Sequence, residues 1–132
     1  MPAKTILIID DDAANRELLR DLLEGAGFTV IAVGDAADAF PRLSQDVDLV
    51  LLDLVMPRAT MDGFTFLSSA GARPELADTP VIVLSGLGES VVAAIDPGTA
   101  TALRIVEVIA KPVDISALLS VIHGVLDVKN PP

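Results

Sequence analysis

The segment Ile6-Leu7-Ile8-Ile9-Asp10-Asp11-Asp12 is an apolar run that ends abruptly on three acids. Three later runs end on a polar residue in the same way: residues 49–52 on Asp53, residues 81–84 on Ser85, and residues 106–110 on Lys111. Short apolar runs that are separated by helical patterns are typical of buried parallel strands. The four runs therefore predict an α/β fold with a parallel sheet at its centre.

Strand and helix patterns alternate five times along the chain. We expect strands at residues 4–9, 28–33, 49–52, 81–84 and 105–110, each followed by a helical segment. Alternating β and α units form right-handed crossovers, which leave the strands parallel. The sequence thus predicts a flavodoxin-like (βα)5 fold, in which a five-stranded parallel sheet carries helices on both faces.

The first and last expected helices have the clearest signals. The first begins at Asp12 as its N-cap and ends around residues 25–27, where two glycines lie. Its apolar face is expected to consist of Leu18, Leu19, Leu22, Leu23 and Ala26. The last helix follows Asp114 as its N-cap. Its apolar face is expected to consist of Ile115, Leu118, Leu119, Ile122 and Leu126.

The helices between them are less regular. Pro41 lies inside the second, at residues 35–43, and predicts a short or kinked helix because proline removes a backbone hydrogen bond. The third is expected after residues 62–63. The fourth is expected within residues 89–103, where residues 96–98 interrupt it.

Composition limits the class of protein. The chain has 132 residues, which fits one domain on a prior of ~150 residues per domain. The net charge of −10 disfavours direct binding of nucleic acid, whose phosphates would be repelled. The chain has no cysteine, no signal-peptide pattern and no apolar run near the ~20 residues of a membrane span. We therefore expect a cytoplasmic protein without a membrane partner.

The polar residues at the strand ends predict one shared pocket. Parallel strands present their carboxyl ends at the same edge of a sheet, where open α/β folds bind ligands. Asp10, Asp11 and Asp53 would meet there, and such closely spaced carboxylates repel one another unless a cation neutralises them. Oxygen ligands without histidine or cysteine favour Mg²⁺. Ser85 and Lys111 are suited to phosphate oxygens instead.

Cation, ammonium and hydroxyl together suit phosphoryl transfer, which depends on positioning and charge stabilisation. Asp53 is the candidate nucleophile, because a carboxylate can form an acyl phosphate and this one lies on a central strand.

These segments, together with Asp53-Leu54-Val55-Met56-Pro57 and Lys111-Pro112, resemble the receiver domain of two-component response regulators, the CheY-like family. The resemblance covers the whole chain and implies a receiver domain at residues 4–128, with a tail or linker at 129–132. It implies that Asp53 accepts a phosphoryl group. It also implies that Asp10, Asp11, Asp53 and the backbone carbonyl of Val55 hold Mg²⁺. Ser85 would sense the phosphoryl group, and Lys111 would pair with it.

The same resemblance implies the partners. The phosphodonor would be a sensor histidine kinase or a histidine phosphotransferase, and phosphorylation would switch the binding of a downstream effector or of an output domain. A second copy of the chain, in a homodimer, is compatible with this interpretation. The protein would not be an enzyme beyond its Mg²⁺-dependent self-phosphorylation and autodephosphorylation.

Three departures from the family pattern concern the route from the pocket to the output. The loop after Pro57 is lengthened by the stretch Arg58–Met61. Val108 stands three positions before the lysine, where many receivers carry an aromatic switch residue. The stretch around Pro97 lacks the usual small-residue pattern. These departures leave the predicted pocket unchanged.

Two other functions are open on the residues alone. A phosphatase of the haloacid-dehalogenase type would use Asp10 as its nucleophile, with Asp12, Ser85 and Lys111 in support. The absence of a threonine after the acids and of a second acidic pair after Lys111 counts against it, and Asp53 would have no role. A degenerate receiver acting only as a scaffold is disfavoured by the intact set of five pocket residues.

Overall fold

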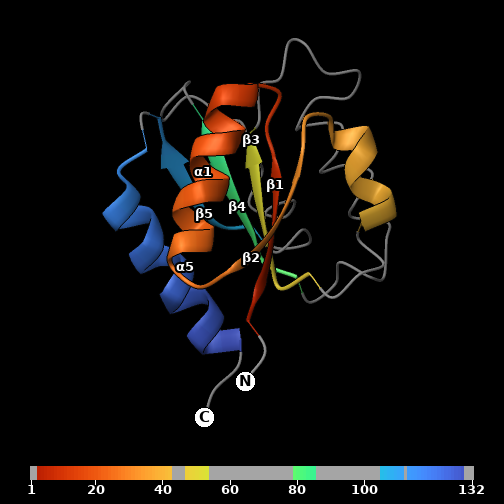
Figure 1. Cartoon of the computed structure of the whole chain (residues 1–132). Coiled ribbons are helices and arrows are strands. Elements are labelled where there is room, and N and C mark those ends of the chain that lie inside the picture. The colour runs from red at the N-terminus through yellow and green to blue at the C-terminus, as the bar shows by residue number, and fades with distance from the viewer. Residues whose placement is uncertain (1–2, 43–46, 54–78, 86–104, 112, 130–132) are drawn as a thin grey trace.

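The structure, a computed structural model, describes residues 3–42, 47–53, 79–85, 105–111 and 113–129 (Figure 1). The elements in chain order are β1 Thr5–Ile9, α1 Ala13–Gly25, β2 Thr29–Val33, the 3-10 helix η1 Ala36–Arg42, β3 Leu49–Asp53, β4 Val81–Ser85, β5 Ile105–Ala110 and α5 Ile115–Lys129. The five predicted strands are all present, to within one residue at either end. The predicted third and fourth helices, Val55 and the Arg58–Met61 loop lie outside the described residues.

The strands form one parallel sheet in the order β2-β1-β3-β4-β5. The first three apolar runs form its centre, because β1, β3 and β4 have neighbours on both sides. In the register, Ile9 lies opposite Leu52, and Asp53 lies opposite Leu84. All carboxyl ends therefore lie at one edge, toward which the arrowheads in Figure 1 point.

Both faces of the central strands are buried. Ile6 and Ile8 of β1 belong to a core cluster with leucines of α1 and α5, which lie on the same side of the sheet in Figure 1. Leu7 and Ile9 point to the opposite face and are also fully buried. Because both faces of β1 are covered, residues 6–9 of this strand are all apolar and do not alternate between apolar and polar.

The fourth apolar run, at β5, is buried less than expected. Val106 is 43% exposed, and Glu107 and Ala110 are also exposed. The reason is that β5 is the last strand in the sheet order and, among the described strands, pairs only with β4. The prediction of a buried strand was therefore wrong for this run and right for the first three.

Helix α1 begins as predicted. The Asp12 side chain accepts hydrogen bonds from the N–H groups of Ala14 (3.0 Å) and Asn15 (3.2 Å), so Asp12 is the N-cap. The helix ends at Gly25, and Gly27 then takes a φ of 99°, a conformation that glycine adopts without steric cost.

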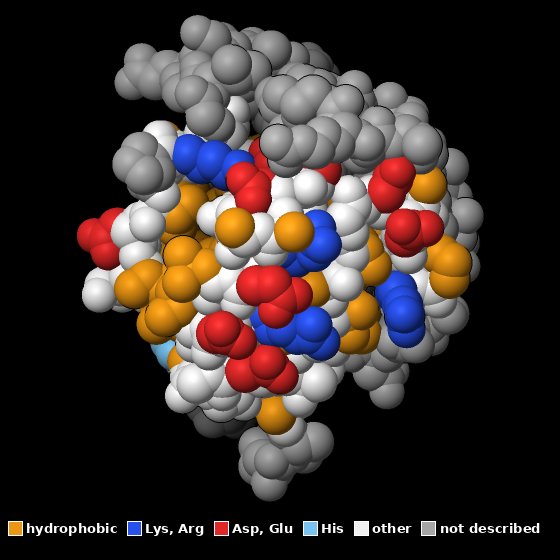
Figure 2. All heavy atoms as spheres, turned by 45° about the horizontal axis from the view of Figure 1, so that its top comes forward, with side chains coloured by type: hydrophobic (Ala, Val, Ile, Leu, Met, Phe, Trp, Pro, Cys, Tyr) orange, Lys and Arg blue, Asp and Glu red, His pale blue; other side chains and the backbone are white. Residues whose placement is uncertain are grey.

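The apolar face predicted for α1 was only partly right. Leu19 and Leu23 are buried against the sheet, whereas Leu18 is 58% and Leu22 38% exposed. Successive helical residues are about 100° apart, so a stripe centred on Leu19 and Leu23 turns Leu18 and Leu22 to one side. Ala26 follows the end of the helix and is exposed. Figure 2 accordingly shows hydrophobic side chains among intermixed acidic and basic ones on the visible face.

The second and last helices follow their sequence signals. The predicted short helix around Pro41 is the 3-10 helix η1, whose tighter turns occur in short pieces. In α5, Ser116 N–H donates to the Asp114 carboxylate (3.0 Å), as expected for an N-cap. The predicted apolar face is confirmed by its burial: Leu118, Ile122 and Leu126 are buried, and Ile115 and Leu119 pack partly buried against the same cluster. Among the helices in the described ranges, none is long and apolar enough to cross a membrane.

Candidate functional site

Three acids meet at the carboxyl edge of the sheet. Asp10 follows β1 and Asp53 ends β3, and both are buried, whereas Asp11 is partly exposed. Each offers a carboxylate oxygen, and these oxygens lie within 4.8 Å of one another. The predicted juxtaposition of Asp10, Asp11 and Asp53 is therefore present. Such a set of oxygen donors fits a hard divalent cation such as Mg²⁺.

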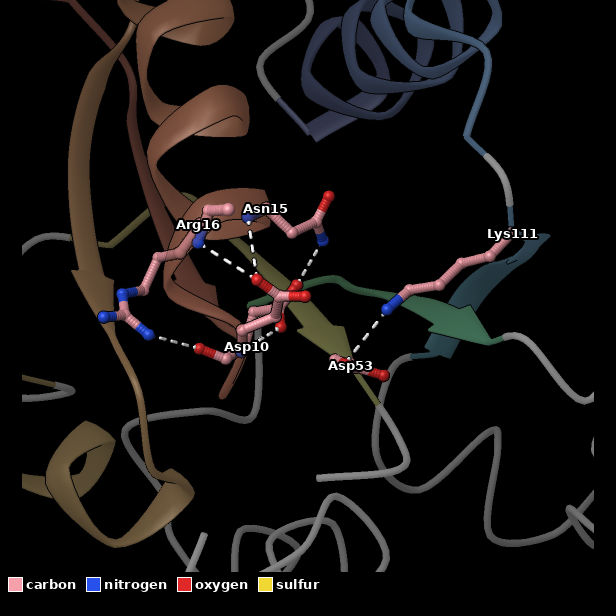
Figure 3. A network of polar contacts seen from close by, with 7 residues as sticks. Asp10, Asn15, Arg16, Asp53 and Lys111 are labelled. Atoms are coloured by element: carbon pink, nitrogen blue, oxygen red, sulfur yellow. Dashed lines mark hydrogen bonds and ion pairs between the residues drawn. The ribbon is translucent and has the colours of Figure 1, made fainter. Parts of the chain in front are cut away.

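Lys111 directly follows β5 and lies at the same carboxyl edge of the sheet as the acids. Its Nζ lies 3.0 Å from Oδ2 of Asp53, with both a hydrogen bond and an ion pair (Figure 3). The Lys111 side chain is 28% exposed, so water partly screens its charge, whereas the Asp53 side chain is only 7% exposed. The Lys111 ammonium thus forms an ion pair with one of the two buried carboxylates of the site.

The ends of β4 and β5 are joined beside this pair. The Lys111 N–H donates to the Ser85 carbonyl oxygen at 2.8 Å, which fixes the start of the lysine side chain relative to β4. Ser85 is the last residue of β4 and is buried. In the β3–β4 register it lies one residue beyond Leu84, the partner of Asp53. The structure therefore places Ser85 and Lys111 on adjacent strands at the edge that carries Asp53.

Two residues that were not predicted from the sequence belong to the site. Asn15 and Arg16, in the first turns of α1, both contact Asp10 (Figure 3). The Asn15 Nδ2 donates to Oδ2 of Asp10, and the Arg16 Nη1 donates to the Asp10 carbonyl oxygen at 2.8 Å. Their position one turn after the acidic run was the available signal, because a helix that starts at Asp12 turns these side chains back toward the strand end.

The position of Val55, whose carbonyl is the remaining predicted ligand, lies outside the described residues. The described residues provide three carboxylates that could bind a cation, and one ammonium group, that of Lys111, in contact with Asp53. This arrangement combines a cation site with a counter-charge for a transferred phosphoryl group, which are the requirements of phosphoryl transfer to a carboxylate.

A family model described as the response regulator receiver domain matches residues 6–123. The chain belongs to this family. It is a receiver domain of the kind found in two-component response regulators, with the five-stranded α/β architecture that the sequence predicted. The match begins in β1 and ends in α5, so it includes all four strand-end segments of the site.

Similar proteins include receivers in longer chains. A protein-glutamate methylesterase/protein-glutamine glutaminase of Anaeromyxobacter dehalogenans is 48% identical over 84 residues, which are 61% of this chain and 22% of that protein. The transcriptional regulator NtrC of a Bradyrhizobium strain is 37% identical over 96% of this chain and 25% of its own length. This receiver chain thus spans about a quarter of the length of these two relatives.

A solved structure shows the same fold. The signal receiver domain of a histidine kinase from Syntrophus aciditrophicus superposes with a TM-score of 0.78 at 28% identity, covering 98% of this chain and 95% of that one. The haloacid-dehalogenase alternative finds no support in these comparisons. Nor does the site favour it, because Asp53, which has no role in that scheme, lies among the acids and contacts Lys111.

Proposed function

We propose that this receiver domain takes a phosphoryl group on Asp53 from a phosphohistidine of a sensor histidine kinase or of a histidine phosphotransferase. The observation that carries the proposal is the position of Asp53. It ends a central strand, it is buried, and it lies both within the acid cluster and in contact with Lys111. Membership of the receiver family supports the choice of donor.

In this proposal a carboxylate oxygen of Asp53 attacks the phosphorus atom, and the bond from phosphorus to the donor imidazole nitrogen breaks. The electron pair of that bond leaves with the imidazole. The Lys111 ammonium, 3.0 Å from Oδ2, neutralises negative charge on the phosphoryl oxygens. Asp10, Asp11 and Asp53 would hold Mg²⁺, with the Val55 carbonyl as a further ligand. Bound there, Mg²⁺ would neutralise charge on the same oxygens.

Phosphorylation would change the conformation of the domain through new contacts of Ser85 and Lys111 with the phosphoryl group. A charge-assisted hydrogen bond contributes about 1.5–3 kcal/mol, whereas inversion of a population from 1:99 to 99:1 needs about 5.5 kcal/mol. Ser85 alone is therefore too weak to complete the switch. Ser85 and Lys111 are tied through the Ser85 carbonyl, which supports the proposal that they act together.

The partners follow from this role. The phosphodonor is a histidine kinase or phosphotransferase. The receptor of the signal is an effector protein or an output domain, and the relatives, which are longer than this chain, include transcriptional regulators. A homodimer is compatible with the same role. We propose no catalysis beyond self-phosphorylation and autodephosphorylation at Asp53.

Labelling identifies the acceptor. Incubation with acetyl phosphate and Mg²⁺ should add one phosphoryl group, which peptide mass spectrometry should place on Asp53. Asp53→Asn should abolish the label and retain the fold, as judged by circular dichroism. Asp21→Asn, at an exposed position of α1, is the matched control and should be labelled normally. Label on Asp53→Asn protein, or label on Asp10 in the unaltered protein, would refute the assignment.

A further inference from the structure

The first turn of α1 holds the Asp10 carboxylate by both of its oxygens (Figure 3). The Asp12 N–H donates to Oδ1 at 2.9 Å, and the Asn15 amide Nδ2 donates to Oδ2. The carboxylate plane therefore cannot rotate without losing one of the two bonds. Its orientation toward Asp11 and Asp53, whose oxygens lie within 4.8 Å, is set before any ligand arrives.

The main chain of Asp10 is held as well. Its N–H donates to the Val33 carbonyl oxygen at 3.1 Å, and its carbonyl oxygen accepts from the Arg16 Nη1 at 2.8 Å. Gly34 leaves the room that Arg16 needs, because a Cβ on residue 34 would lie 2.8 Å from that Nη1. The guanidinium therefore lies where any larger residue at position 34 would place its side chain.

We propose that Asn15 is a positioning residue for cation binding, and that Arg16, seated over Gly34, supports it from the main-chain side. The inference rests on the proposed Mg²⁺ site at Asp10, Asp11 and Asp53. Carboxylates that repel one another bind a cation more tightly when their orientation is already fixed. Partners that hydrogen-bond to a metal-ligating residue typically account for a factor of about 10–100 in metal affinity.

If Asn15 served only to stabilise α1, its replacement would have a different effect on Mg²⁺ binding. Asparagine is a weaker helix former than alanine or leucine, so either replacement should favour α1 by propensity alone. If Asn15 served only the helix, Asn15→Ala and Asn15→Leu would leave Mg²⁺ binding unchanged. If it positions Asp10, both variants should bind Mg²⁺ more weakly even where the helix is no less stable.

The test is a Mg²⁺ titration of the whole chain. Because the chain has no Trp or Tyr, the titration is followed by calorimetry and by amide NMR shifts rather than by intrinsic fluorescence. We expect the Kd of Asn15→Ala and Asn15→Leu to rise about tenfold, at the lower end of that range, because Asn15 is only partly buried. Leu18→Ala, a neutral change at an exposed position of α1, is the control and should keep the original Kd.

Gly34→Ala tests the second support without altering any residue that contacts the acids through its side chain. It should displace the Arg16 guanidinium and raise the Kd in the original background, and it should have no effect in an Arg16→Gln background. An equal effect of Gly34→Ala in both backgrounds would overturn the role given to Arg16.

The outcomes separate this inference from the proposed function. Absence of Mg²⁺ binding by the unaltered chain would overturn both. Binding by the unaltered chain, with a Kd that changes less than twofold in both Asn15 variants, would overturn the positioning role alone. A rise of about tenfold in both variants, with Leu18→Ala unchanged, is the expected result.

Discussion

Asp53 and Lys111 are 58 residues apart in the sequence and form a 3.0 Å contact in the structure. The ion pair compensates a negative charge that would otherwise be unfavourable, because Asp53 is buried beside two other acids. An ionised carboxylate that is removed from water is costly unless a positive charge or hydrogen bonds compensate it. Without Mg²⁺, Lys111 is the cation in direct contact with Asp53 in the part of the chain that the structure describes.

Lys111→Met removes this charge and retains most of the side-chain length. We expect the free energy of unfolding without Mg²⁺ to fall by about 1.5–2 kcal/mol, the lower part of the range for bonds to charged groups, because Lys111 is partly exposed. Mg²⁺ should restore part of the loss by supplying positive charge to the same acids. Urea unfolding in EDTA and in Mg²⁺ measures both values.

The control for Lys111→Met is Lys4→Met, which removes a lysine that precedes β1 at the opposite edge of the sheet. It should change the free energy of unfolding by less than about 0.5 kcal/mol, with or without Mg²⁺. Equal losses in the two variants would mean that the contact with Asp53 does not stabilise the domain.

At the scale of elements, α1 connects the fold to the site. Asp12 caps the helix with its side chain, while its N–H donates to the Asp10 carboxylate. The same turn thus begins the helix and orients a site residue. At the other end of the helix, Gly27 adopts a positive φ and reverses the direction of the chain. The Phe28 N–H then donates to the Leu23 carbonyl oxygen at 3.1 Å, and the chain continues into β2.

Two glycines at this end provide a matched pair. A Cβ on either Gly25 or Gly27 would meet no atom within 4 Å, so the substitutions differ only in backbone conformation. Gly27→Ala should lower the free energy of unfolding by about 1 kcal/mol, because its φ is 99°. Gly25→Ala, at the last position of the helix, should leave it unchanged or raise it by up to about 1 kcal/mol. Thermal and urea unfolding of both variants tests the difference.

A loss of equal size in both glycine variants would contradict this explanation of the helix end. It would indicate that the chain needs glycine there for a reason other than the left-handed conformation of residue 27.

At the scale of the whole molecule, the central strands supply the rigid support of the site. Leu51 of β3 is fully buried and lies two residues before Asp53. Leu51→Ala should lower the free energy of unfolding by about 2–5 kcal/mol, as large-to-small core substitutions do. Leu18→Ala, the same change at a 58% exposed position, should alter it by less than about 1 kcal/mol. Chemical denaturation gives both values, and similar losses would contradict the assigned core.

The positions of the site residues were predictable because parallel strands share an edge. An apolar run followed by an acid or a lysine indicates both the strand and the edge of the sheet at which that polar residue lies. Asp10, Asp11, Asp53 and Lys111 were found together for this reason, and Asp12 and Asp114 cap the helices as their residue types indicate. The structure shows where these side chains lie, and the roles in metal binding and phosphorylation of Asp10, Asp11, Asp53, Val55, Ser85 and Lys111 stay predictions.

Other features followed only from the packed structure. Helical periodicity alone did not distinguish Leu19 and Leu23, which face the sheet, from Leu18 and Leu22, which turn toward solvent. That choice depends on where the α1 axis lies over β1, which the packing of two layers decides. The exposure of β5 likewise depends on its place at the end of the strand order.

The sequence by itself determined the parallel α/β architecture and the identity of the strand-end residues, because both follow from local patterns and from the shared direction of the strands. Tertiary structure alone decided how Asp10 is held. Asn15 and Arg16 close on it because α1 starts at Asp12 and packs beside β1, and Arg16 fits because position 34 carries no side chain. The sequence position of Asn15 and Arg16 one turn after the acids indicated that these contacts were possible, but the fit of Arg16 over residue 34 depends on the distance between elements, which sequence spacing does not specify.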